Sequence, residues 1–81
     1  MKIYSPTLFI EISNSKFIFT VGDENEENIF KVIYKNTETA QGITNYRIAD
    51  FNLVSEIIKK NVYSIELKFN YTFKDLILII N

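Results

Sequence analysis

The hydrophobic and polar positions of the chain follow two periods, which predict three strands, a helix and a last strand. Residues 7–12 are nearly all apolar, as expected for a strand that is covered on both faces. Residues 16–21 alternate between two faces, and the polar residues 13–15 before them favour a tight turn. The two strands are therefore expected to pair as a hairpin.

A third strand is predicted over residues 29–35, after an acidic segment at residues 23–28 that we expect to be a solvated hairpin tip. Its alternation places Phe30, Val32 and Tyr34 on one face, which we expect to be the apolar one. Three consecutive antiparallel strands result.

A helix is predicted after a longer polar connection at residues 36–49. Asp50 is suited to cap its first turn, because an Asp side chain accepts hydrogen bonds from the unpaired amide groups there. Apolar residues then recur at spacings of three and four up to residue 69, which predicts one apolar stripe along an amphipathic helix. The stripe consists of Phe51, Val54, Ile58, Val62, Ile65 and Phe69.

The last strand, at residues 76–80, is apolar on both faces. A right-handed crossover through the helix places it parallel to the first strand and beside it. The predicted architecture is an α/β fold with the element order β-β-β-α-β, a mixed sheet of order 3-2-1-4 and one helix on one face. Since a single helix covers a single face, we expect further chain, self-association or another protein to cover the second face.

Composition narrows the possible functions. The 81 residues are 47% hydrophobic and carry a net charge of −1, so the chain has neither the polarity of a disordered segment nor the positive field of a nucleic-acid-binding protein. The sequence contains no His and no Cys, which excludes the usual zinc sites, a Cys or His nucleophile and disulfides within these residues.

Three segments carry a family resemblance. Residues 11–16 read Glu-Ile-Ser-Asn-Ser-Lys, and the second strand ends in Val21 and Gly22. Residues 40–50 precede the helix, and four of them share the family spacing: Gly42, Ile43, Ile48 and Asp50. In these features, and over residues 8–80, the chain resembles the N-terminal segment of FtsA, a bacterial cell-division family of the actin-like ATPase superfamily. That family opens with an Asp-Ile-Gly-(Thr or Ser)-Ser-Lys turn.

The resemblance implies a ribonuclease-H-like, actin-like half-domain, with residues 1–81 as the N-terminal part of a nucleotide-binding subdomain in a longer protein. It implies that the intact protein binds ATP and Mg²⁺. The residues implied to contact the cofactor are Glu11, Ser13, Asn14, Ser15 and Lys16, with Glu11 holding Mg²⁺ through a water molecule. The chain departs from the family at Glu11, where the family has Asp, and at Ser13 and Tyr46, where it has Gly.

The resemblance also implies a function. FtsA-like proteins are ATP-binding adaptors that self-associate and tether the FtsZ ring to the inner face of the membrane, with at most weak ATPase activity. The chain is accordingly expected to be cytoplasmic and peripheral to the membrane, with membrane contact made by segments outside these residues. Two alternatives stay open. One is another actin-fold ATP-binding protein, PilM-like or sugar-kinase-like, and the other is a small stand-alone protein-interaction module without a nucleotide.

Overall fold

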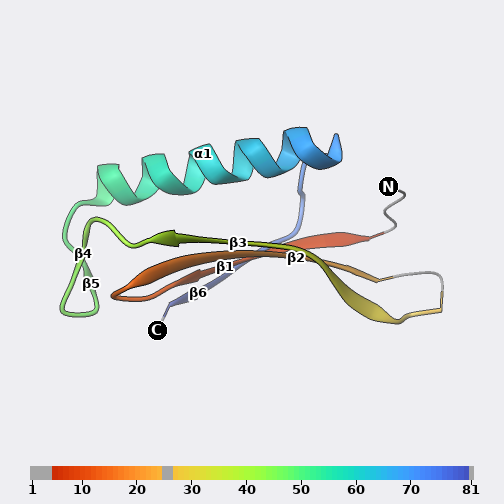
Figure 1. Ribbon diagram of the computed structural model, residues 1–81, viewed down its shortest axis with the longest axis horizontal. Coiled ribbons are helices and arrows are strands. Elements are labelled where there is room, and N and C mark those ends of the chain that lie inside the picture. Colours follow the sequence, from red (N-terminus) through yellow and green to blue (C-terminus); the bar gives the residue numbers. More distant parts are fainter. Residues whose placement is uncertain (1–4, 25–26, 81) are drawn as a thin grey trace.

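The computed structural model describes residues 5–24 and 27–80, and these form two layers, a sheet and a helix that lies along one of its faces (Figure 1). The elements in chain order are β1 Pro6–Ile12, β2 Lys16–Glu24, β3 Phe30–Thr39, β4 Ile43–Thr44, β5 Arg47–Ile48, α1 Phe51–Phe69 and β6 Leu76–Ile80. Strands β2 and β3 extend beyond the predicted ends at residues 21 and 35. Residues 25–26 of the predicted acidic tip lie outside the described residues.

The predicted sheet order is confirmed. The four long strands lie in the order β3-β2-β1-β6, with β1 antiparallel to β2, β2 antiparallel to β3, and β1 parallel to β6. The polar connection before the helix contains a structure that the sequence interpretation missed. Strands β4 and β5 pair there as a small separate hairpin.

The core lies between the sheet and the helix. It is built from alternate residues of β1 and β2, which all face α1, and from two residues of the helix stripe. Its buried members are Leu8, Ile10, Ile12, Phe17, Phe19, Val21, Val54 and Ile65. Burial of these apolar side chains supplies most of the free energy that holds the two layers together.

Both ends of the helix are capped. The side chain of Asp50 accepts a hydrogen bond from the Leu53 amide at 3.1 Å, as the sequence predicts. Asn70 adopts the left-handed conformation at the other end, with φ 51°. Its backbone amide donates to the Glu66 and Leu67 carbonyls of the last helical turn. Phe51, in the first helical turn, is the one residue of the predicted stripe that lies largely outside the core, with 71% of its surface exposed.

A bulge in β3 divides the face of that strand that the sequence predicts to be apolar. The pairing register shifts between Val21 and Gly22, so one extra residue of β3 is accommodated and the alternation changes side. Tyr34 therefore faces the helix, where its ring contacts Phe69 with centroids 5.8 Å apart. Phe30 faces the other way, and its ring meets Phe9 edge-on at 5.9 Å.

A buried polar residue links the helix to β3. Asn61 is 6% exposed, and its side-chain amide donates hydrogen bonds to Glu38 Oε2 at 3.0 Å and to the Ile57 carbonyl at 2.9 Å. Its Oδ1 accepts a third hydrogen bond from Asn36 at 3.1 Å. The polar groups of Asn61 are thereby satisfied inside an otherwise apolar layer.

Strand β6 is poorly covered. All of its five residues are exposed, from 41% at Ile79 to 62% at Ile80, and the described residues place a helix on one face of the sheet only (Figure 1). On the other face, Ile77 and Ile79 lie in register with Phe9 and Glu11 of β1. The structure thus agrees with the expectation that this apolar strand lacks cover within these residues. Within the described residues, no helix is long and apolar enough to cross a membrane.

Candidate functional site

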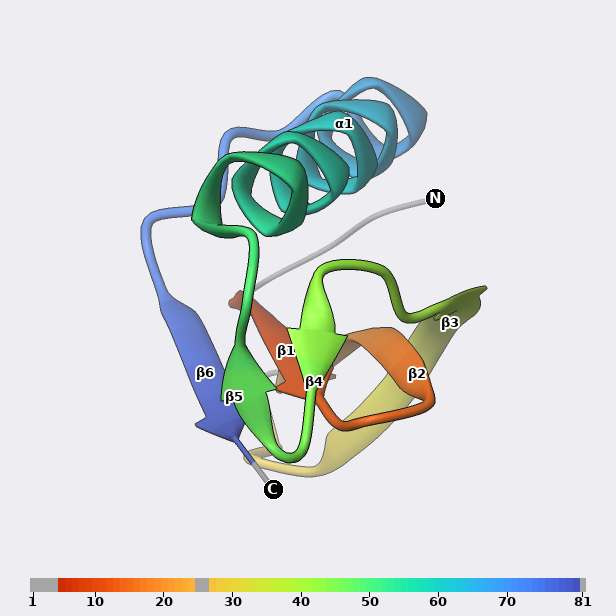
Figure 2. The ribbon, with the colours of Figure 1, turned by 90° about the vertical axis from the view of Figure 1, so that its left-hand side faces the viewer.

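The β1–β2 turn, the β4–β5 hairpin and the start of α1 lie together at one edge of the sheet (Figure 2). Because β1 and β6 are parallel, their carboxyl ends reach this same edge, with Ile12 opposite Ile80. In open α/β sheets, ligands bind at the carboxyl ends of the strands. We therefore take this edge, here called the turn edge, as the candidate site.

The turn is closed by the Ser13 side chain. The Ser13 hydroxyl donates to the Lys16 carbonyl at 3.0 Å and lies 3.1 Å from the Lys16 amide, which donates to it. The Ser13 amide donates to the same carbonyl at 3.0 Å. These contacts fix the shape of the turn and occupy the amide groups at both of its ends.

The two middle residues of the turn accept hydrogen bonds from neighbouring segments, while their own backbone N–H groups stay unbonded within the described residues. Asn14 Oδ1 accepts a hydrogen bond from the Tyr46 amide at 2.8 Å, and the Ser15 carbonyl accepts one from the Ala40 amide at 3.0 Å. Within the described residues, the backbone N–H groups of Asn14 and Ser15 donate no hydrogen bond. Consecutive amides of this kind can converge on an anion.

The β4–β5 hairpin turns at Asn45 and Tyr46, which have φ 51° and φ 61°. Positive φ at both central residues is typical of the tight two-residue hairpin turn, in which Gly is favoured at the second position. The hairpin is joined to the helix through Gly42, at φ 80°, whose carbonyl accepts hydrogen bonds from the Ala49 and Asp50 amides at 2.7 and 3.1 Å. The hairpin is thus held on one side by the turn and on the other by the helix start.

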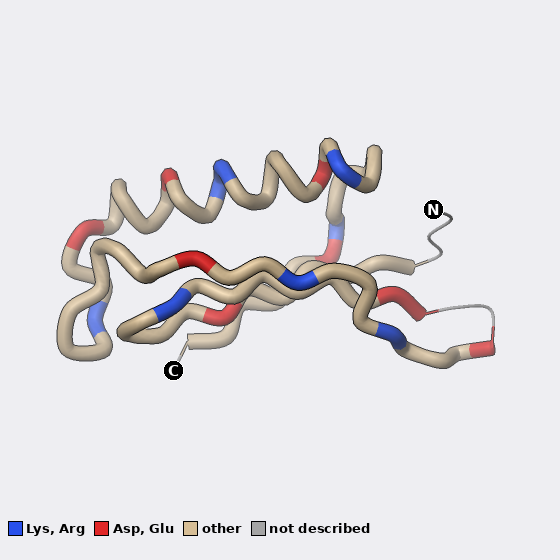
Figure 3. The backbone as a smooth tube through the Cα atoms, in the orientation of Figure 1, with Lys and Arg blue, Asp and Glu red and all other residues tan. Residues whose placement is uncertain are grey.

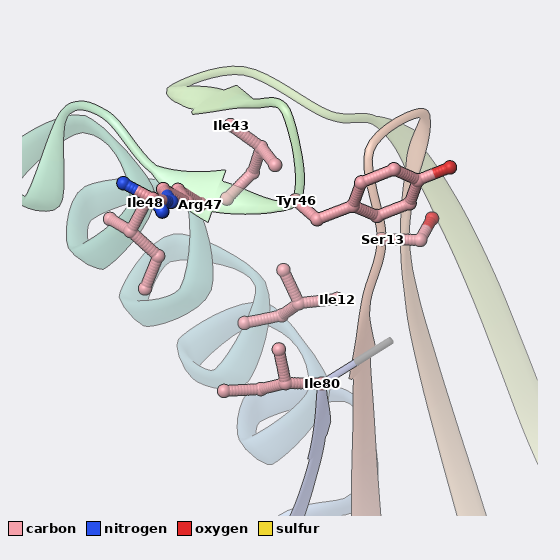
Figure 4. A pocket seen from close by; sticks show the side chains of 7 residues that line it. All are labelled: Ile12, Ser13, Ile43, Tyr46, Arg47, Ile48 and Ile80. Atoms are coloured by element: carbon pink, nitrogen blue, oxygen red, sulfur yellow. The ribbon is translucent and has the colours of Figure 1, made fainter.

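A small cavity lies between the turn and the hairpin (Figure 4). Its volume of about 10 Å³ corresponds to the space of one water molecule. It is lined by Ile12, Ser13, Ile43, Tyr46, Arg47, Ile48 and Ile80. A larger apolar groove of about 270 Å³ continues from it between α1 and β6 and shares Ile12, Ile48 and Ile80 with it.

The predicted site residues are only partly brought together. Residues 13–16 form the turn itself, whereas Glu11 lies on the sheet face opposite the helix, in register with Ile18 and Ile79 and partly buried. The described residues contain no group of three or more His, Cys, Asp or Glu that could hold a metal ion.

Charges are spread over both layers, with Lys and Arg interspersed among Asp and Glu along the helix and the sheet (Figure 3). At the turn edge, the side chains of Lys16 and Arg47 are exposed. A local positive charge is thus available there, although the net charge of the chain is −1.

The sequence interpretation did not assign Tyr46 and Arg47 to the site, because it treated residues 36–49 as a connection. The signal that could have found the hairpin is the symmetric placement of Ile43 and Ile48 on either side of Asn45 and Tyr46, together with the glycine that the resembled family has at position 46. A hairpin with a tight turn follows from that pattern.

Comparison with known proteins supports the fold. No protein-family model matches the sequence, and no curated protein matches it. Among solved structures, the Aquifex aeolicus member of the Ppx/GppA family matches 91% of this chain with a TM-score of 0.60 and 11% identity. The type II variant of the Aquifex aeolicus Ppx/GppA phosphatase matches 93% of it with a TM-score of 0.58 and 10% identity.

The fold is that of an actin-like half-domain. TM-scores of 0.60 and 0.58 support this architecture, and identities of 11% and 10% leave the function open. The chain spans about a quarter of the length of the two structures, 25% and 26%. The predicted fold class is therefore confirmed at the level of the actin-like half-domain.

Proposed function

We propose that this chain is the phosphate-contacting first part of an actin-like nucleotide-binding protein, and that the β1–β2 turn contacts the phosphates of ATP. The observation that carries the proposal is the pair of N–H groups at Asn14 and Ser15, which have no acceptor among the described residues and lie at the carboxyl edge of β1 and β6. Fixed backbone donors at such an edge suit a bound anion.

Each predicted residue has a distinct role in this proposal. Asn14 and Ser15 offer backbone donors, and the exposed Lys16 ammonium adds a positive charge that pairs with phosphate. Ser13 holds the turn closed through its contacts with Lys16, so its role is to shape the turn. Glu11 orients water on a phosphate-bound Mg²⁺ from the uncovered face of the sheet.

The finer form of the proposal is an FtsA-like, ATP-binding cell-division adaptor. It is supported by the resemblance of residues 11–16 and 40–50 to that family and by the fold. In this form the intact protein binds ATP with Mg²⁺, hydrolyses it weakly, self-associates and attaches the FtsZ ring to the inner face of the cell membrane.

A second candidate is a phosphatase of the Ppx/GppA kind, which the two structural matches favour. Both candidates place phosphate groups at the turn edge, so they differ in what happens after binding. Steady release of inorganic phosphate would favour the phosphatase. Weak hydrolysis together with co-sedimentation with FtsZ filaments would favour the adaptor.

The shared step is tested by titrating the intact protein with the Mg²⁺ complex of AMPPNP, a non-hydrolysable ATP analogue, in a calorimeter. We expect Lys16→Gln to weaken binding about tenfold, because a charged hydrogen bond to phosphate is lost. The matched control is Lys35→Gln on β3, which removes an exposed Lys from the same sheet and should leave affinity unchanged. No binding by the unmodified protein at millimolar AMPPNP, or equal affinity for both variants, would overturn the proposal.

A further inference from the structure

Tyr46 occupies a backbone conformation that disfavours it. Its φ of 61° lies in the left-handed region, where a side chain crowds the following carbonyl oxygen and Gly or Asn is preferred. Asn45, the other residue of the turn, has φ 51° and is one of the preferred types. The strain at this hairpin is therefore concentrated on Tyr46.

The ring of Tyr46 contributes little to the fold. It is 72% exposed. Three aromatic pairs are in contact within the described residues, and Tyr46 belongs to none of them. By contrast, Tyr34 is partly buried and packs against Phe69. Packing therefore does not explain why a Tyr occupies a strained position that Gly would fill without steric strain. Backbone strain of this kind is concentrated at functional sites.

The position of the ring indicates what it contacts. The Tyr46 amide is held by Asn14 Oδ1 at 2.8 Å, which fixes the hairpin tip against the turn. The side chain then reaches from the hairpin across to the turn, with its hydroxyl on the same side as the Ser13 hydroxyl (Figure 4). A phenol hydroxyl is a hydrogen-bond donor, and it points here to the same turn whose next two residues, Asn14 and Ser15, have unbonded backbone amides.

We propose that Tyr46 is a ligand-binding residue whose hydroxyl donates a hydrogen bond to a phosphate oxygen of a triphosphate bound at the β1–β2 turn. The inference rests on the proposed function and adds to it a second element, the β4–β5 hairpin, as part of the phosphate site. In this proposal the Asn14–Tyr46 hydrogen bond positions the Tyr46 phenol at the turn.

The test uses two variants at this position and a control. Tyr46→Phe keeps the ring and removes the hydroxyl, and Tyr46→Gly removes the ring and relieves the strain. Tyr63→Phe is the matched control, because Tyr63 is 63% exposed on the helix away from the turn. Binding is measured by calorimetry with two probes, Mg²⁺–AMPPNP and inorganic triphosphate, and stability is measured by thermal unfolding.

We expect Tyr46→Phe to bind both probes about five- to tenfold more weakly, as for the loss of one hydrogen bond to a charged group. Tyr46→Gly should bind at least as weakly while unfolding at a higher temperature, and Tyr63→Phe should match the unmodified protein. A purely structural role would change stability and leave affinity unchanged.

The experiment distinguishes a failure of the Tyr46 inference from a failure of the proposed function. Unchanged affinity of both Tyr46 variants, with Lys16→Gln still weakened, would overturn this inference and leave the proposed function standing. A loss confined to AMPPNP would place Tyr46 at the nucleoside and overturn the phosphate contact. Absence of binding to both probes by the unmodified protein would overturn the inference together with the proposed function.

Discussion

Asn14 Oδ1 accepts a hydrogen bond from the backbone amide of Tyr46 at 2.8 Å, across a sequence separation of 32 residues. This contact joins the β1–β2 turn to the β4–β5 hairpin. The hairpin is in turn joined to the first helical residues through Gly42. The turn edge is thus one connected unit, made of segments that are far apart in the chain.

Replacing Asn14 should loosen that unit. We expect Asn14→Ala to lower the free energy of unfolding by about 1 kcal/mol, the typical net value of one hydrogen bond. Asn14→Asp is the matched control, because it keeps an acceptor for the Tyr46 amide and should stay close to the unmodified protein. Chemical denaturation measures both, and an Asn14→Ala variant as stable as the Asp variant would contradict the role of this contact.

The two glycines of the chain should respond differently to alanine. At Gly42, φ is 80° and an added Cβ would lie 2.9 Å from the Asp50 carbonyl oxygen and 2.9 Å from Val54 Cγ2, so we expect Gly42→Ala to cost more than about 1 kcal/mol. At Gly22, the added Cβ would meet the ring end of Phe30. Phe30 is 51% exposed and its ring can move aside, so Gly22→Ala should cost less.

Thermal unfolding of the two alanine variants measures this difference. A shift of about 4–8 °C corresponds to 1 kcal/mol for a domain of this size. Equal melting temperatures for Gly42→Ala and Gly22→Ala would contradict the structural account of the hairpin.

Asn61 should be more important to stability than its residue type suggests. Replacing it with Ala removes its three hydrogen bonds and leaves partly buried groups of Asn36 and Glu38 without that partner. We expect a loss of about 1–3 kcal/mol in the free energy of unfolding. Asn52→Ala, at an exposed position of the same helix, should be neutral. Denaturant unfolding measures the free energy of unfolding of both variants. An Asn61→Ala variant as stable as the unmodified protein would show that the network does not stabilise the fold.

The exposed strand β6 should promote self-association of this chain. Its five apolar residues carry no charge and form an edge of the described sheet, where unpaired backbone groups can bind another strand. We expect sedimentation to show association that increases with concentration and that Ile79→Lys reduces. Thr37→Lys, on the opposite edge strand β3, should leave association unchanged. A protein that stays monomeric at every concentration, or equal effects of the two variants, would contradict this prediction.

Much of the fold was predictable from hydrophobic periodicity. The helix, its Asp50 cap and the strand order followed from residue types and from the handedness of the crossover. The faces of β3 were not predictable, because one extra residue at a bulge reverses the alternation, and no residue type marks that position uniquely. Asn61 was missed for a related reason, since a single polar residue in a helix pattern does not reveal its partners.

The candidate site was predictable only in part. The turn at residues 13–16 stands out as a polar break between two strands, and it lies at the carboxyl end of β1, the position at which open α/β sheets generally bind ligands. The contribution of Tyr46 depends on a positive φ and on a contact with a residue 32 positions away. A tight two-residue turn favours Gly at the position that Tyr46 occupies. The sequence does not show the positive φ of Tyr46, so the strain is recognised only from the backbone conformation.

Amide NMR spectra of the intact protein, recorded during titration with Mg²⁺–AMPPNP, test the central claim most directly. If the β1–β2 turn binds phosphates through its backbone, the amide signals of Asn14 and Ser15 will shift in proportion to occupancy, and those of residues 71–73 at the other end of the helix will stay in place. Saturable binding that leaves the signals of Asn14 and Ser15 unmoved would contradict the claim.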